Sequence, residues 1–138
     1  MANPSEPWQP LLDSLEKLRS QWPGSTWGWD PRFKSVASSF NKEIASRVRA
    51  AMAGVLDQEW SATTVTASPP DVRALAGKYG GIREGQMLYT GTSADGMYLF
   101  GLWWPWGDGA TVSLRIGVAN CHRPTDVYPT VRAVFHLP

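Results

Sequence analysis

Two runs rich in apolar residues, 97–104 and 110–118, lie on either side of the dipeptide Asp108-Gly109. Each run is long enough for a β-strand, and Asp-Gly between two such runs is a strong signal for a β-hairpin. Opposed residues of an antiparallel pair point to the same face of a sheet. The hairpin is therefore the strongest constraint on the fold, because its register decides which side chains can enter a core.

The residues of this hairpin separate into two distinct sets if the connecting loop contains an even number of residues. Met97, Leu99, Gly101 and Trp103 then share one face with Val112, Leu114, Ile116 and Val118. The second face carries Tyr98, Phe100, Leu102 and Trp104 with Thr111, Ser113 and Arg115. We predict that the first, apolar set faces the core, with Trp106 at the turn, whereas an odd-length loop would exchange the two sets.

Three further segments predict strands because they are rich in β-branched or aromatic residues. They are residues 60–67, 85–91 and 128–137. In the last segment the apolar residues from Val131 to Leu137 alternate with Arg132, Val134 and His136, which places Arg132 and His136 on the second face. Together the strands form an antiparallel meander of four or five strands.

Helical spacing of apolar residues predicts two N-terminal helices. The first covers residues 8–22. The second is long, because an apolar residue recurs every three or four positions over 31–57. Asp30 and Pro31 are favourable residues for its N-cap and first position.

A shorter helix is expected over 68–81, where Ser68 and Asp71 have the spacing of a capping box and Pro69 suits the first helical position. These elements predict one α+β domain over residues 1–138. The N-terminal helices, above all the long amphipathic one, are expected to pack on one face of the antiparallel meander.

The charge and cysteine content of the 138-residue chain excludes several classes of protein. A net charge of +1 with scattered basic residues is not typical of a nucleic-acid-binding protein. The single cysteine, Cys121, can form neither an internal disulfide nor a four-cysteine zinc site. Residues 1–10 do not resemble a secretory signal, and the nearly apolar run 98–106 is too short to span a membrane. We expect a soluble, cytoplasmic protein.

No set of residues has the pattern of a catalytic site. Cys121 and His122 are adjacent, so their side chains point in opposite directions on an extended segment. Catalysis would need His136 and Asp126 to approach Cys121, and a buried or incidental cysteine is the simpler interpretation. The glycines of residues 77–85 lack the spacing of a phosphate-binding loop. We expect no catalytic residue, no metal and no cofactor.

The second face of the sheet is the candidate functional surface because it combines aromatic residues with arginine, which are enriched at the hot spots of protein interfaces. The predicted partner-binding residues are Tyr98, Phe100, Trp104, Trp106, Arg115, Arg132 and His136. Alternatively, the first helix or a second subunit covers this face. Base stacking is disfavoured because an RNP1-like string is missing, and membrane insertion because no basic cluster lies beside the tryptophans.

These features predict a non-catalytic module that binds a protein partner and sequesters or inhibits it. Its general build resembles that of bacterial immunity proteins, which bind and block a cognate toxin, and this resemblance is architectural. A small-ligand-binding protein or small enzyme is the alternative, with a pocket between helix and sheet. That pocket would be lined by Trp60, Tyr89, Trp103, Cys121 and His136. An obligate homodimer that buries the second face is a further alternative.

Overall fold

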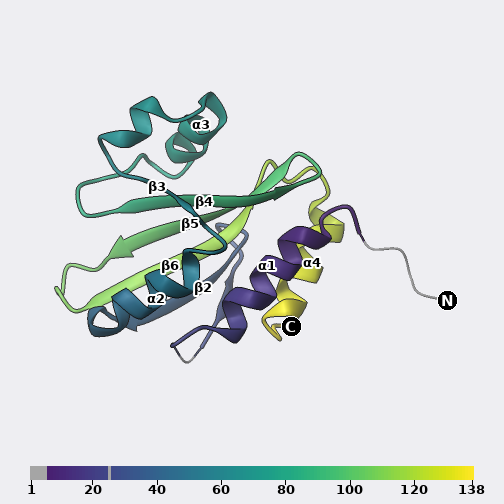
Figure 1. The fold of residues 1–138 in the computed structure, drawn as a ribbon, viewed down its shortest axis with the longest axis horizontal. Helices are drawn as coiled ribbons and strands as arrows, with labels where there is room; N and C mark the ends of the chain where they lie inside the picture. Colours follow the sequence, from purple (N-terminus) through teal and green to yellow (C-terminus); the bar gives the residue numbers. More distant parts are fainter. Residues whose placement is uncertain (1–5, 25) are drawn as a thin grey trace.

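A six-stranded antiparallel sheet, in the order β1-β2-β6-β5-β4-β3, is the centre of the molecule (Figure 1). The computed structural model describes residues 6–24 and 26–138, so part of the segment on which the absence of a leader was predicted lies outside it. In chain order the elements are α1 (Gln9–Ser20), β1 (Gly28–Asp30), β2 (Ser35–Asn41), η1 (Lys42–Ile44), α2 (Ala45–Met52), β3 (Gln58–Trp60), η2 (Thr64–Ala67), α3 (Pro70–Lys78), β4 (Met87–Ala94), β5 (Met97–Pro105), β6 (Thr111–Ala119) and α4 (Pro124–Val134). The fold is α+β, with six strands rather than four or five.

The central hairpin of β5 and β6 has the predicted register. Leu99 pairs with Val118, and Trp103 pairs with Leu114. The Trp106 N–H donates to the carbonyl oxygen of Thr111, so these two residues form the last pair of the hairpin. The loop between them, 107–110, therefore contains an even number of residues. The first face is therefore the apolar one, and the side chain of Trp103 on it is only 2% exposed.

Helices α1, α2 and α4 cover the first face and form the principal core with it. The helical residues of this core include Leu11, Leu15, Leu18, Val48, Met52, Val127 and Val131. Helices α1 and α4 lie side by side (Figure 1), and the Trp8 indole N–H donates to the Thr130 hydroxyl at 3.2 Å. The N-terminal helix thus packs on the first face and not on the second.

The prediction of one helix over 31–57 is wrong, because the first half of that segment forms a turn and strand β2. Val36 and Phe40 are four residues apart, a spacing that places them on one side of a helix and equally on one face of a strand. The segment between them is rich in serine, which is a weak helix former. This segment therefore pairs with β6 along the whole of β2 instead of forming a helix, and the α-helix begins only at Ala45.

The predicted terminal strand 128–137 is also wrong, because this part of the chain lies mostly in α4. Pro124 suits the first turn of the helix. Val127, Val131 and Phe135 follow at four-residue steps, and all three are buried. The helix places all three on its buried side. Arg132 lies within this helix and His136 follows it, so neither residue is part of the sheet.

Residues 60–81 hold less strand than predicted. Strand β3 ends at Trp60, and the short 3-10 helix η2 follows it. Helix α3 begins at Pro70 without a capping box, because the Ser68 hydroxyl donates to the Val65 carbonyl instead. The β-branched run 62–66 is thus a connection between edge strand and helix.

The second face of the sheet has two halves. In the covered half, side chains of α3 pack on Leu88, Phe100 and Leu102. In the open half, Ala37, Ser39, Trp104, Ser113 and Arg115 surround a hollow over β2 and β6. No helix among the described residues packs on that hollow, so part of the second face remains accessible.

Candidate functional site

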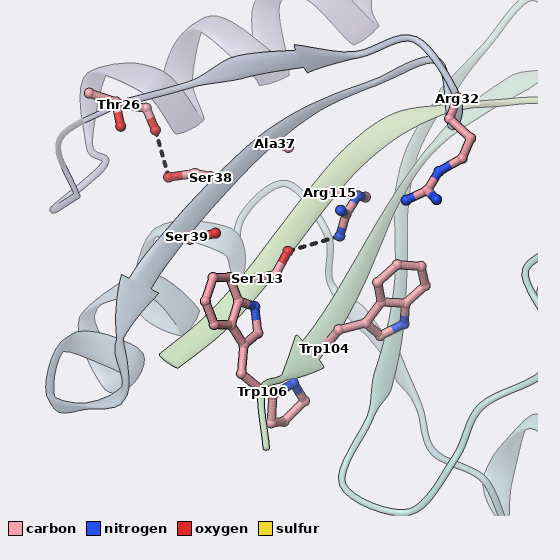
Figure 2. Close-up of a pocket in the computed structure, with 10 residues that line it drawn as sticks. Thr26, Arg32, Ala37, Ser38, Ser39, Trp104, Trp106, Ser113 and Arg115 are labelled. Atoms are coloured by element: carbon pink, nitrogen blue, oxygen red, sulfur yellow. Dashed lines mark hydrogen bonds between the residues drawn. The ribbon is translucent and has the colours of Figure 1, made fainter. Parts of the chain in front are cut away.

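The open half holds a hollow of about 540 Å³ (Figure 2). Its floor consists of small side chains, Ala37 and Ser39 from β2 and Ser113 from β6. Its walls are the indoles of Trp104 and Trp106 and the guanidinium groups of Arg32 and Arg115. The hollow exists because short side chains on two neighbouring strands lie beside large ones on β5 and in the two connecting turns.

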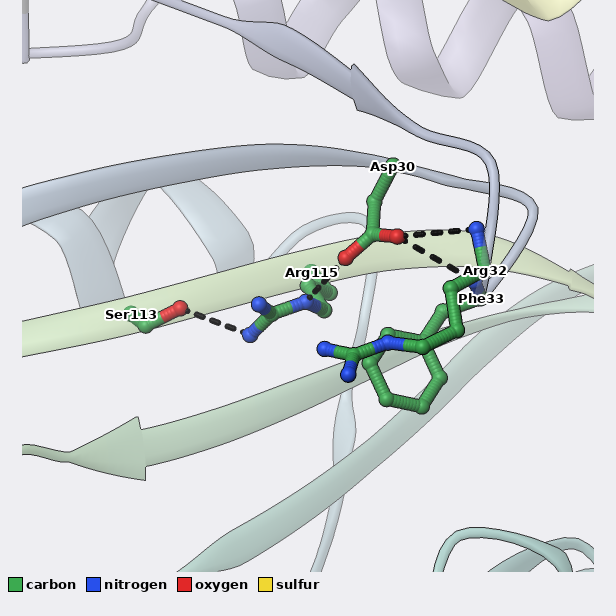
Figure 3. A network of polar contacts seen from close by, with 5 residues as sticks. All are labelled: Asp30, Arg32, Phe33, Ser113 and Arg115. Carbon is green, nitrogen blue, oxygen red and sulfur yellow. Dashed lines mark hydrogen bonds and ion pairs between the residues drawn. The ribbon is translucent and has the colours of Figure 1, made fainter.

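Arg115 is held in one orientation by two hydrogen bonds (Figure 3). Its Nε donates to Asp30 Oδ2 at 2.9 Å, and its Nη1 donates to Ser113 Oγ at 2.8 Å. The guanidinium carbon also lies 4.9 Å from the ring centroid of Trp104 and 5.2 Å from that of Phe33. These contacts fix a charged side chain that is only 18% exposed.

Asp30, predicted as a helix N-cap, uses the same acceptor capacity in the turn between β1 and β2. Its Oδ1 accepts the backbone N–H groups of Arg32 and Phe33. Burial raises the pKa of Asp30, but the hydrogen bonds from Arg115 and from these two N–H groups outweigh it, so the pKa lies below its ordinary value. The carboxylate is therefore ionised at neutral pH.

Arg32 lines the hollow as well, although the sequence did not indicate it as a candidate site residue. Its guanidinium lies 4.4 Å from the centroid of the Phe33 ring and points into the same hollow as Arg115 (Figure 2). The Arg32 guanidinium forms no hydrogen bond or ion pair with the described residues; only the Arg32 backbone N–H has a partner, Asp30 Oδ1. No periodic pattern marks Arg32, because it lies in a turn, and only the pairing of β1, β2 and β6 brings that turn to the site.

Three of the seven predicted partner-binding residues meet at this hollow: Trp104, Trp106 and Arg115. Phe100 lies in the covered half and is 2% exposed, against the ring of Tyr79. Tyr98 is half-buried in the same half. Burial, and secondarily the charge of Asp71, raises the pKa of Tyr98 to about 12.

The remaining two predicted residues lie at α4. The Arg132 guanidinium is 5.1 Å from the centroid of the Trp29 ring, and both residues line a separate hollow of about 400 Å³. His136 follows the helix with a φ of 57° and is exposed. The predicted set thus divides into an accessible hollow, a buried cluster and a second surface.

The residues named for a pocket between helix and sheet do not line a common cavity. Trp60 packs in the cluster beneath α3, whereas Tyr89 and Trp103 lie in the principal core with ring centroids 6.1 Å apart. Cys121 lines a hollow near Tyr128, and His136 lies beyond the end of α4. Beside α2, a separate hollow of about 300 Å³ is lined by Arg49, Met52 and Tyr89 but by none of the other four named residues.

The adjacent Cys121 and His122 have different neighbours. The His122 imidazole lies 2.8 Å from the Asp95 carbonyl oxygen and 3.5 Å from the Asp95 carboxylate. Burial raises the pKa of Tyr128 to about 12, with a smaller contribution from Cys121 beside it.

Residues 6–24 and 26–138 contain no group of His, Cys, Asp and Glu that could hold a metal ion. None of their helices has the length and apolar character needed to cross a bilayer.

Comparisons of the chain with protein-family models, with curated proteins and with solved structures found no match. A function can therefore be proposed only from the geometry and chemistry of the site.

Proposed function

We propose that this chain is a non-catalytic protein-binding module and that its partner binds to the open half of the second face. The observation that carries the proposal is the exposure of Trp106. Its side chain is 51% exposed, and no other large hydrophobic side chain of the described residues is as exposed. It stands at the rim of the hollow beside the stacked pair of Trp104 and Arg115. Trp and Arg in such a patch are typical of interface hot spots.

The fixed positions of Arg115 and Trp104 support a binding role for the hollow. Arg115 is fixed by Asp30 and Ser113, and Trp104 packs edge-on against Phe33 at 5.6 Å. Side chains that are already fixed lose little conformational entropy when a partner arrives. A partner held on this surface is sequestered by occlusion, as a toxin is by an immunity protein, and occlusion needs neither a catalytic residue nor a cofactor.

The experiment is affinity capture of the tagged chain from its native cells, followed by affinity measurement with the purified partner. We expect one dominant partner at near-equal stoichiometry. Trp106→Ala should weaken its binding by about 2 kcal/mol, or about 30-fold in Kd, because a hot-spot tryptophan is lost. Arg83→Gln is the matched control, since Arg83 is exposed and lies outside the hollow. A partner that binds Trp104→Ala and Trp106→Ala as tightly as the wild type would refute the proposal.

A further inference from the structure

The hollow contains more positive than negative charge. The guanidinium groups of Arg32 and Arg115 point into it, and no Asp or Glu lines it. Asp30 is the one carboxylate that hydrogen-bonds Arg115, and its other oxygen is occupied by backbone N–H groups. Two cations and one anion leave a local excess of one positive charge. All Asp and Glu residues of the chain lie in its described part, and none except Asp30 forms an ion pair with Arg32 or Arg115.

The hollow also offers hydrogen-bond donors without acceptors. Ser113 is only 6% exposed, and its oxygen accepts from Arg115, so its own hydrogen is left to donate. No described residue accepts that hydrogen. Arg115 Nη2 and the Arg32 guanidinium likewise have no acceptor among the described residues. A buried hydroxyl and two guanidinium groups that converge on one space match a carboxylate.

We propose that the partner anchors itself with a short acidic segment whose Asp or Glu carboxylate enters the hollow between Arg32, Arg115 and Ser113. An apolar side chain next to that carboxylate packs on the exposed indole of Trp106. This inference rests on the proposed function and adds the chemistry of the partner. A neutral apolar segment would instead cover the Arg32 guanidinium and leave it without a partner, which costs free energy.

A protein segment fits this site better than a nucleic acid does. The chain has a net charge of only +1, and the two arginines converge on one hollow rather than following an extended stripe. Nucleic-acid binding depends on many phosphate contacts along a backbone. One carboxylate beside one apolar side chain matches the single charge excess and the single exposed indole.

The test selects short random peptides displayed on phage against the full chain and then measures synthetic copies by calorimetry. The enriched peptides should contain Asp or Glu beside an apolar residue. Replacing that acid by its amide should weaken binding to the wild type about tenfold, as expected for a hydrogen bond to a charged group. On Arg32→Gln the same replacement should change binding by clearly less than tenfold, because the interaction between the acid and Arg32 is already lost and only those with Arg115 and Ser113 remain. On the control Arg83→Gln the tenfold effect should persist.

The outcomes separate this inference from the proposed function. Enriched peptides that contain no acid but still require Trp106 would overturn the acidic anchor. So would copies with a phosphorylated residue in place of the acid, if they bind more tightly than the carboxylate peptides and still require Trp106. Peptides whose affinity is unchanged by Trp106→Ala would overturn the proposed surface itself. Failure to select any binding peptide would contradict the inference, because the inference states that a short acidic segment binds the hollow by itself.

Discussion

The covered and open halves of the second face belong to the same sheet but are built from different side chains. Leu88, Phe100 and Leu102 of the covered half are at most 3% exposed beneath α3. In the open half, several side chains on the same face of the sheet are small or charged, such as Ser39 and Arg115. Leu102 lies within the covered half, whereas Trp104, two positions further along the same strand, packs at the edge of that cluster and also lines the hollow. The neighbouring strand and the covering helix, rather than the strand itself, decide which role a side chain has.

The difference also explains why the open half is stable without a helix. Apolar side chains as large as Phe100 must be covered, whereas Arg115 has Asp30 as a counter-ion and Ser113 as an acceptor. The ion pair with Asp30 balances the charge of Arg115 without a covering helix. The open half therefore does not depend on burial to persist, and it is available to a partner.

The largest expected effect is in the covered half. Phe100→Ala should lower the free energy of unfolding by about 3–5 kcal/mol, because a fully buried ring is replaced by a cavity. Ser39→Ala, the control in the open half, should change it by less than about 0.5 kcal/mol. Urea unfolding measures both. Losses of similar size would mean that the two halves do not differ as the structure indicates.

A smaller effect is expected for the charged pair of the open half. Arg115→Gln should cost about 1–3 kcal/mol at pH 7, because Asp30 loses a charged donor in a site that is only 16% exposed. The folded-state pKa of Asp30 lies below the ordinary value of 3.8, so the stability that it contributes is present above that pH. This contribution is lost as the pH falls through the folded-state pKa.

Urea unfolding of wild type and Arg115→Gln at pH 7 and at several pH values below 3.8 tests this sign. The difference between the two proteins should narrow as Asp30 becomes protonated in the wild type. A difference that stays constant with pH would show that Arg115 stabilises the chain by packing against Trp104 and Phe33 instead.

The smallest effect on stability is expected at Trp106. Trp106→Ala should change the free energy of unfolding by less than about 0.5 kcal/mol, because the side chain is 51% exposed and its backbone hydrogen bond to Thr111 remains. Trp103→Ala is the comparison on the first face, where about 3–5 kcal/mol should be lost. Thermal and urea unfolding compare the pair. A large loss at Trp106 would assign it a structural role and weaken its assignment to partner binding.

The two largest errors in the predicted elements, the helix over 31–57 and the strand over 128–137, have one cause. Val36 and Phe40, like Val131 and Phe135, are four residues apart, and this spacing is compatible with a helix and with a strand. Long-range partners decide between the two. Strand β2 pairs with β6, whereas α4 packs against α1, and neither partner can be identified from the local sequence. The hairpin of β5 and β6 was predictable because its two strands are neighbours in the chain.

The sequence by itself determined that side chains alternate between two faces along β5 and along β6. The even length of the loop, which the structure shows, then placed Trp103 in the core and Trp104 and Arg115 on the other face. The alternation holds because adjacent residues of a strand must point to opposite faces. Only the tertiary structure decided which half of that face α3 covers. It also decided that the turn between β1 and β2, which contains Arg32, lies at the hollow. Those contacts join segments distant in the sequence, and they form only when the whole sheet and its helices pack together.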